Sequence, residues 1–347
     1  MAASRPESSQ HSSPPRVTIC IPVRNRPALI SRAMHSALAQ DAQSLEILIV
    51  DNCSTDSTWD VATSFDDPRL RCVKNESNLG IIGNFNRCLE LCNGEYIRIL
   101  CSDDQLAPGT IKREVALLDA HPEVALLCSP SIERLPNGRS RILQGCYLAE
   151  GIYEGRTAIA NLLWLYALSQ ANPLNLPSAI LMRARAVRQA GFFDGSFVCA
   201  SDLEYWFRLL SHGDLGISLE PACEVSLHPH SESSRLWESG TAMKDLFELA
   251  RRCRLQLDEH GLSKAISRHF AGTCYLHMVK AILLGRPRAA RNFFNIPRRH
   301  GANSALAIPA LLRSLLRRAL PRVPGAGSLQ QPRLWRAPET DIHLDCA

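Results

Sequence analysis

The chain has 347 residues, of which 46% are hydrophobic and 21% are charged, and its formal net charge is +5. These proportions are those of an ordinary soluble globular protein, long enough for one large domain with an appendage or for two domains. We expect neither a secretory signal nor a membrane-spanning helix, because residues 1–15 are rich in Ser and Pro and no run of 18 apolar residues occurs. The thirteen scattered cysteines form no Cys-x-x-Cys pair, which favours reduced, mostly buried thiols over a zinc site or a disulfide framework.

The charge is distributed unevenly along the chain. Residues 281–337 hold eleven Arg and no Asp or Glu, whereas residues 1–280 hold 28 Lys and Arg against 31 Asp and Glu. A strongly basic tail on a slightly acidic protein indicates contact with an anionic surface, which is either lipid headgroups or nucleic acid. The tail has few aromatic residues for stacking on bases, so nucleic acid is the less favoured partner.

Short apolar strands alternate with helical patterns through the first part of the chain. The predicted strands are 17–22, 45–50, 70–74, 96–101 and 124–128, and the predicted helices are 27–40, 58–65, 80–92 and 108–121. This alternation is typical of an α/β fold in which helices cover both faces of a parallel sheet. Ligands of such sheets bind beyond the carboxyl ends of the strands.

The rest of the chain is predicted in three parts. Residues 130–177 are expected to form a loop-rich insert beside the site, followed by a strand at 179–182 and a short helix to residue 190. A helix beginning at Asp202 buries Leu203, Trp206, Phe207 and Leu210. Beyond residue 236 the pattern is helical throughout. Within it, the basic amphipathic segment 305–320 either lies on a membrane surface or packs on the rest of the protein with solvated arginines.

Two adjacent carboxylates, Asp103 and Asp104, follow the largely apolar segment 94–101 after the single residue Ser102. Side-by-side anions repel each other unless a cation lies between them. A hard divalent ion, Mg²⁺ or Mn²⁺, binds carboxylate oxygens and keeps open positions for phosphate. The alternative is a turn that uses Asp for local hydrogen bonds.

Four further polar segments occur at predicted strand ends or helix starts. They are Ile21-Pro22-Val23-Arg24-Asn25, residues 50–58, Asn78-Leu79-Gly80 and residues 200–206. Capping or turn formation would explain any one of them alone. Their joint order favours one site at the edge of the sheet.

With these segments, residues 16–235 resemble the family 2 glycosyltransferases, which are inverting enzymes of the GT-A type. The resemblance rests on Ile-Pro-x-x-Asn, Val-Asp-Asn-x-Ser-x-Asp-x-Thr, Asn-x-Gly, the acidic pair and Asp-x-x-x-Trp-x-x-Arg. It implies a nucleotide-diphospho-sugar transferase fold with a Rossmann-like mixed sheet. We expect three parts: a disordered tail at 1–15, the GT-A domain at 16–235, and a helical, Arg-rich region with a flexible end at 236–347.

The resemblance also implies a role for each matching residue. Asp104 would bind the metal ion, Mn²⁺ or Mg²⁺, and Asp103 would hold the ribose or sugar of the donor. Asp51 and Asn52 would contact the nucleobase and ribose. The other donor-binding positions are Pro22, Arg24, Asn25, Asn78 and Gly80.

Two residues from the second half of the domain complete the predicted site. Asp202 matches the catalytic Asp of the family and would be the general base that accepts the proton of the acceptor hydroxyl; the alternative is a helix N-cap. His228 would complete the metal or diphosphate site, with His230 as a competing candidate and a role unrelated to the site open for both.

This sequence departs from the family pattern at three positions. Asn52 stands where many relatives have Asp, which leaves the base open, and Ser102 replaces the first acid of the DXD triplet. Arg24 occupies a position that is often aromatic, and its guanidinium suits stacking on a base or binding a phosphate.

The sequence therefore predicts a metal-dependent inverting hexosyl- or related transferase in surface polysaccharide or glycolipid assembly. Its partners would be a nucleotide-diphospho-sugar donor, a glycan or lipid-linked acceptor and an anionic membrane surface. We expect it in the cytoplasm, peripheral to the inner face of the membrane. The alternatives are a nucleic-acid- or anionic-surface-binding protein with a vestigial site, an inactive family member, and a sugar-1-phosphate nucleotidyltransferase, which the absence of a Gly-rich phosphate loop disfavours.

Overall fold

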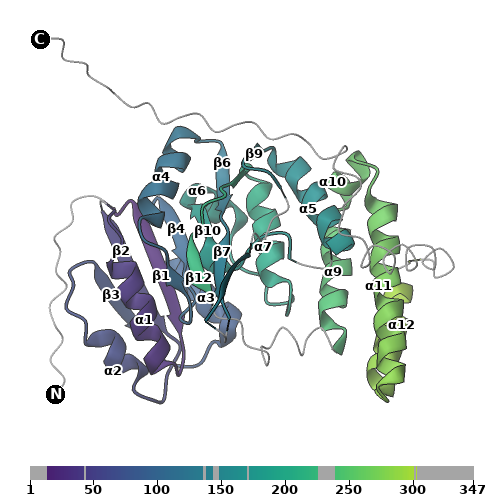
Figure 1. The fold of residues 1–347 in the computed structure, drawn as a ribbon, viewed down its shortest axis with the longest axis horizontal. Helices are drawn as coiled ribbons and strands as arrows, with labels where there is room; N and C mark the ends of the chain where they lie inside the picture. The colour runs from purple at the N-terminus through teal and green to yellow at the C-terminus, as the bar shows by residue number, and fades with distance from the viewer. Residues whose placement is uncertain are drawn as a thin grey trace, which may run out of the picture.

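The protein is built on a central eight-stranded sheet with helices on both faces (Figure 1). The computed structural model describes residues 14–42, 44–135, 138–143, 148–169, 172–225, 239–300 and 302. The strand order is β3-β2-β1-β4-β10-β6-β11-β9. These strands are β1 Val17–Val23, β2 Leu45–Asp51, β3 Leu70–Lys74, β4 Tyr96–Ile99, β6 Val124–Cys128, β9 Gly151–Tyr153, β10 Ile180–Arg183 and β11 Asp214–Ile217.

The sheet is mixed rather than parallel. Strands β3, β2, β1 and β4 are parallel neighbours, as the strand-helix alternation predicts. Strand β10 is antiparallel to both β4 and β6, and β9 is antiparallel to β11. The prediction of a wholly parallel sheet from the alternation is therefore wrong, whereas the mixed sheet implied by the family resemblance is confirmed.

Alternate residues of the strands face two separate apolar layers. Ile19 and Ile21 of β1 pack in the same cluster as Met34, whereas the intervening Cys20 packs with Cys88 on the other face. The helices of this part are α1 Pro27–Leu38, α2 Thr58–Thr63, α3 Gly80–Leu91 and α4 Thr110–Ala120. The predicted bounds of these helices and of strands β1, β2, β3 and β6 agree with the structure within a few residues.

The segment 130–177 is more regular than the sequence indicates. It contains β7 Ser131–Arg134, β8 Ser140–Leu143, the edge strand β9 and the fifteen-residue helix α5 Gly155–Ser169. Helix α5 was not predicted because its own apolar residues are spread around the helix and leave no polar stripe in the sequence. Ala158, Ile159, Leu162 and Leu163 are all buried. A second sheet, in the order β5-β12-β7-β8, adds β5 Gln105–Leu106 and β12 Cys223–Val225.

After α5, the chain forms η1 Pro177–Ala179, α6 Ala184–Ala190 and α7 Ser201–Leu210. The C-terminal helices are α9 Thr241–Arg252, α10 Arg254–Glu259, α11 Ser263–Leu283 and α12 Pro287–Arg299. Phe247, Phe270 and Phe293 from three of them belong to the same apolar cluster as Trp206 of α7. The helical region predicted beyond residue 236 is thus present, and it extends the core of the sheet domain.

Among the described residues, no helix has the length and apolar character needed to cross a membrane. The predicted basic helix at 305–320 lies outside the part of the chain that the structure describes.

Candidate functional site

The site forms where the parallel strands β1, β2 and β4 end at one edge of the sheet. Strand β1 pairs with β2 on one side and with β4 on the other, so the segments that follow them converge. Asn25 after β1 and Cys53 after β2 have φ angles of 52° and 58°. This left-handed backbone turns both loops sharply at the strand ends.

The first two loops are tied together by hydrogen bonds. The backbone amide of Asn25 donates to Ser54 Oγ at 2.9 Å, and Asn25 Oδ1 accepts from the Thr55 amide at 2.9 Å. Asp51 is fully buried; its carboxylate accepts the Ser54 amide at 3.0 Å and also the Ser54 hydroxyl, and Lys74 Nζ lies 3.8 Å away. Asp51 therefore shapes the loop that carries Asn52.

The buried side chain of Asn52 organises the third loop. Its Nδ2 donates to Asn78 Oδ1 at 2.9 Å and to the Gly80 carbonyl at 3.1 Å. Its Oδ1 accepts from the Leu79 amide at 2.9 Å and from Asn75 Nδ2 at 3.2 Å. Since both donors and both acceptors of the amide are used inside the protein, Asn52 holds the 78–80 turn at the rim of the site.

A cleft of about 1090 Å³ opens at this edge. One wall comes from the strand ends and the start of α3, and the other from residues 195–201 before and at the start of α7. The predicted site residues that line it are Pro22, Arg24, Asn25, Asn52, Asn78, Gly80 and Asp103. Asp51, Asp104 and Asp202 are not among the residues that line it, and His228 and His230 are outside the described residues.

The acidic pair follows β4, and its two members have different surroundings. Asp103 lines the cleft and pairs with Arg26, whose Nη1 lies 2.5 Å from Asp103 Oδ2. Asp104 is buried; its Oδ2 accepts a hydrogen bond from Ser178 Oγ at 2.6 Å, and its amide donates to the Cys101 carbonyl at 3.0 Å. Ser178 also accepts the Cys101 amide at 2.9 Å, so η1 fixes the loop of the acidic pair from the far side.

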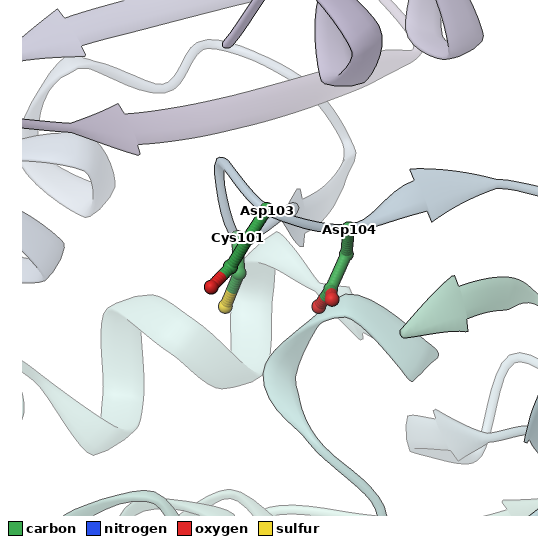
Figure 2. Close-up of side chains that lie close together, drawn as sticks. All are labelled: Cys101, Asp103 and Asp104. Carbon is green, nitrogen blue, oxygen red and sulfur yellow. The ribbon is translucent and has the colours of Figure 1, made fainter. Parts of the chain in front are cut away.

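Cys101, Asp103 and Asp104 have the geometry of a cation site. Their ligand atoms all lie within 4.8 Å of one another, and Figure 2 shows the three side chains pointing to the same side of the loop. Burial, together with the charge of Asp104, raises the pKa of the Cys101 thiol, which keeps it protonated. The two carboxylates rather than the thiol are therefore the candidate ligands, and carboxylate oxygens fit Mn²⁺ or Mg²⁺.

Asp202 lies in the first turn of α7, next to Ser201. Its Oδ1 accepts the Leu203 amide at 2.7 Å, and Asn172 Nδ2 lies 3.5 Å from its Oδ2. Burial raises the pKa of Asp202 from 3.8 to about 6. The alternative of a helix N-cap is wrong, because α7 begins at Ser201 and its cap residue is Ala200. The neighbours Ser201 and Cys199 line the cleft.

Comparison with known proteins identifies the first half of the chain. Residues 18–167 match the model of the family described as Glycosyl transferase family 2. Residues 18–167 are thus a glycosyltransferase family 2 domain. This confirms the resemblance that the motifs indicated.

Curated relatives of this glycosyltransferase domain cover parts of the chain. An uncharacterized Mycobacterium tuberculosis protein is 27% identical over 207 residues, which are 58% of this chain and 64% of the relative. The Escherichia coli protein WfaP, named UDP-Glc:alpha-D-GlcNAc-diphosphoundecaprenol beta-1,3-glucosyltransferase, is 35% identical over 103 residues, which are 30% of this chain and 41% of WfaP. The chain thus spans less than two thirds of the length of these relatives.

A solved structure confirms the fold over most of the chain. Residues 1–349 of S. aureus TarS, in complex with UDP-GlcNAc, align with a TM-score of 0.62 at 17% identity. The alignment covers 89% of this chain and 93% of the TarS chain. The two proteins share the GT-A fold, which in this chain has a mixed sheet and is followed by a helical C-terminal region.

Two side chains of the site were not identified from the sequence of the glycosyltransferase domain. Arg26 lies two residues beyond Arg24, and its charge alone did not distinguish it from the other arginines. Ser178 contacts an acid 74 positions earlier in the chain. No local sequence pattern predicts such a contact, because it depends on the direction of β10, the strand that follows Ser178.

Proposed function

We propose that this protein is a metal-dependent inverting glycosyltransferase that moves a sugar from a nucleotide-diphosphate donor to an acceptor hydroxyl. One observation carries the proposal: seven of the predicted donor-site residues line a single cleft at the carboxyl edge of the sheet. Asp103 is one of them, and Asp104, the other member of the acidic pair, is buried next to it in the chain. The naming of WfaP and the UDP-GlcNAc complex of TarS support a sugar nucleotide as the donor. We assign the enzyme to the assembly of surface polysaccharide or glycolipid, with a glycan or lipid-linked acceptor.

The donor nucleotide occupies the wall formed by the first three loops. Pro22 and Asn25 form the base pocket with the loop that Asp51 holds, and Asn52 supports the turn of Asn78 and Gly80 along the opposite rim. Arg24 is exposed in the cleft, where its planar guanidinium can stack on a base or pair with a phosphate.

Asp103 and Asp104 hold the divalent cation and the sugar-proximal part of the donor. Asp104 is the metal ligand, oriented by Ser178, and Asp103 exchanges its partner Arg26 for the donor's ribose or sugar. A bound Mn²⁺ or Mg²⁺ supplies positive charge against the charge that develops on the diphosphate leaving group. His228, which lies outside the described residues, is proposed as a further ligand, with His230 as the alternative.

Asp202 acts as the general base. A carboxylate with a pKa of about 6 is ionised at neutral pH and more basic than an ordinary Asp, which suits proton removal from an acceptor hydroxyl. Inverting transfer requires the base on the side of the anomeric carbon away from the leaving group, and in the proposed complex Asp202 acts from that side.

The proposal also includes the domain organisation of the chain and its location in the cell. The glycosyltransferase domain spans 16–235, after a tail at 1–15 and before the helical, Arg-rich region at 236–347. The protein works in the cytoplasm, peripheral to the inner face of the membrane.

The experiment that tests this function measures thermal stability of the full chain with UDP, GDP, dTDP and CMP, each with and without Mn²⁺. We expect one nucleotide to raise the melting temperature only with Mn²⁺. In the variant Asp104→Asn this shift is lost, whereas the exposed Asp66→Asn, which removes the same charge outside the site, retains it. A nucleotide shift that Asp104→Asn leaves intact would refute the metal assignment. No shift with any of the four nucleotides would favour a vestigial site.

A further inference from the structure

The turn between α11 and α12 exposes a cluster of apolar side chains. These helices pack side by side at the end of the molecule that lies away from β3 (Figure 1). Four large apolar side chains in the last turns of α11 and at its C-cap are exposed: Val279 at 47%, Ile282 at 60%, Leu283 at 81% and Leu284 at 55%. Single exposed apolar residues are ordinary, but a contiguous group of this size indicates a binding surface.

Cations surround this cluster, which with Lys280, Arg286 and Arg288 we call the α11–α12 tip. All three of these basic residues are exposed. Residues 261–300 contain eight Lys and Arg and no Asp or Glu. The tip therefore combines an apolar surface with a positive charge that its own helices do not offset.

Acidic residues on the neighbouring helices are engaged elsewhere. On α9, Glu248 pairs with Arg251 at 2.6 Å, and on α10, Asp258 pairs with Arg254 at 3.2 Å. Glu259 pairs with Arg156 of α5 at 3.6 Å. Within the part of the chain that the structure describes, these acidic groups therefore do not neutralise Lys280 and Arg288, the two cations on which the argument rests.

A small cavity adds a place for an anionic headgroup. It has a volume of about 190 Å³ and lies between α11 and α12 at the tip. Its lining combines His277, Lys280 and Arg286 with the apolar side chains of Leu284 and Phe293. This mixture of cationic and apolar groups suits a phosphate attached to an acyl-bearing molecule.

We propose that the α11–α12 tip docks on an anionic phospholipid bilayer. Leu283 and its apolar neighbours enter the boundary between headgroups and acyl chains, while Lys280 and Arg288 contact phosphates. The tip lies outside the glycosyltransferase cleft and shares no residue with it. The proposal thus rests on the peripheral membrane location proposed above, and not on the proposed catalytic residues.

Vesicle co-sedimentation of the full chain tests this surface. We expect the protein to pellet with vesicles of phosphatidylcholine that contain about one third phosphatidylglycerol, and at least about tenfold less with phosphatidylcholine alone. Leu283→Glu places a charge at the most exposed position and should weaken the partition by at least about tenfold. Lys280→Gln combined with Arg288→Gln should weaken binding and reduce its dependence on salt.

The matched control is Leu255→Glu on α10, where an exposed Leu at 70% is replaced by the same charge. This variant should bind anionic vesicles as the original chain does. Equal binding by Leu283→Glu and the original chain would overturn the proposal and assign vesicle binding to another part, such as the arginine-rich residues 303–337. Absence of vesicle binding by the full chain would overturn it as well.

Two further readouts separate competing explanations. An unchanged melting temperature of Leu283→Glu, and an unchanged nucleotide shift, would show that its loss of vesicle binding is local. A single-stranded oligonucleotide that binds more tightly than the vesicles and is insensitive to Leu283→Glu would overturn the assignment to lipid.

Discussion

Replacing Asp202 by Asn should stabilise the protein while abolishing sugar transfer. The Asn side chain keeps an oxygen that can accept the Leu203 amide, which in the original chain bonds to Asp202 Oδ1 at 2.7 Å. It removes the buried negative charge and, with it, the proton acceptor of the proposed reaction. Stability and activity are therefore expected to change in opposite directions.

The size of the stabilisation follows from the pKa. Burial raises the pKa of Asp202 from 3.8 to about 6, so the folded protein holds this proton more tightly than the unfolded chain does. Such a group destabilises the fold when the pH is above both values, and the penalty disappears as the pH falls below 3.8. A pKa difference of about two units between the folded and unfolded states corresponds to a loss of about 3 kcal/mol in the free energy of unfolding. Because the Asp202 side chain is partly exposed, we expect a smaller loss of about 2 kcal/mol at pH 8.

Urea unfolding of the original chain and of Asp202→Asn at pH 8, 6 and 4 measures this difference. We expect the variant to be more stable by about 2 kcal/mol at pH 8 and by less than about 1 kcal/mol at pH 4. Asp66→Asn, at an exposed position, should differ from the original chain by less than about 0.5 kcal/mol at every pH.

Two results would refute the reasoning about Asp202. If the stability difference between Asp202→Asn and the original chain is the same at pH 8 and pH 4, the ionised Asp202 carboxylate does not destabilise the fold. Normal transfer by Asp202→Asn would mean that another residue is the base. In the original chain, transfer should decline as the pH falls below about 6.

Three other changes test the donor side. Ser178→Ala removes the hydrogen bond to Asp104 without removing a metal ligand. Metal-dependent nucleotide binding, measured by titration calorimetry, should therefore weaken about tenfold rather than vanish. Unchanged affinity would show that Ser178 does not orient the carboxylate. Arg26→Gln releases Asp103 and removes a cation from the cleft, so affinity should fall for nucleoside diphosphates and stay constant for nucleosides; equal losses for both would count against a phosphate contact. Asn52→Asp places carboxylate oxygens against two oxygen acceptors, and urea unfolding should show a loss of about 2 kcal/mol, whereas a neutral result would mean that the 78–80 turn adapts.

The sequence predicted the first half of the fold well because local patterns decide it. Strand β1 is wholly buried and α1 has a clear apolar stripe through Ile30, Ala33, Met34 and Ala37. Helix α5 was missed, since burial on nearly all sides removes the helical period from its residues. The reversed direction of β10 was missed for a different reason: a four-residue apolar run has the same appearance in a parallel and an antiparallel neighbour.

The site, like the fold, has some features that local sequence patterns predict and others that depend on tertiary structure. Residues at strand ends could be predicted because parallel strands bring their carboxyl ends together, and the cleft contains Asn25, Asn78 and Asp103 as expected. The contacts of Ser178 and Arg26 depend on tertiary structure, since their partners lie 74 and 77 positions away. Burial of Asp51 and Asp104 likewise follows from packing that residue identity does not encode.

The order of the site residues along the chain has a consequence for how this enzyme can diversify. Every proposed nucleotide contact among the described residues falls between positions 22 and 104, whereas the proposed base and the wall around it come from 195–202. The chain is thus modular in sequence although the cleft is continuous in space. A chimera that keeps residues 14–128 together with Ser178, and takes the rest of the later segment from a relative, should retain its preferred nucleotide and acquire a new acceptor, if the proposed roles hold.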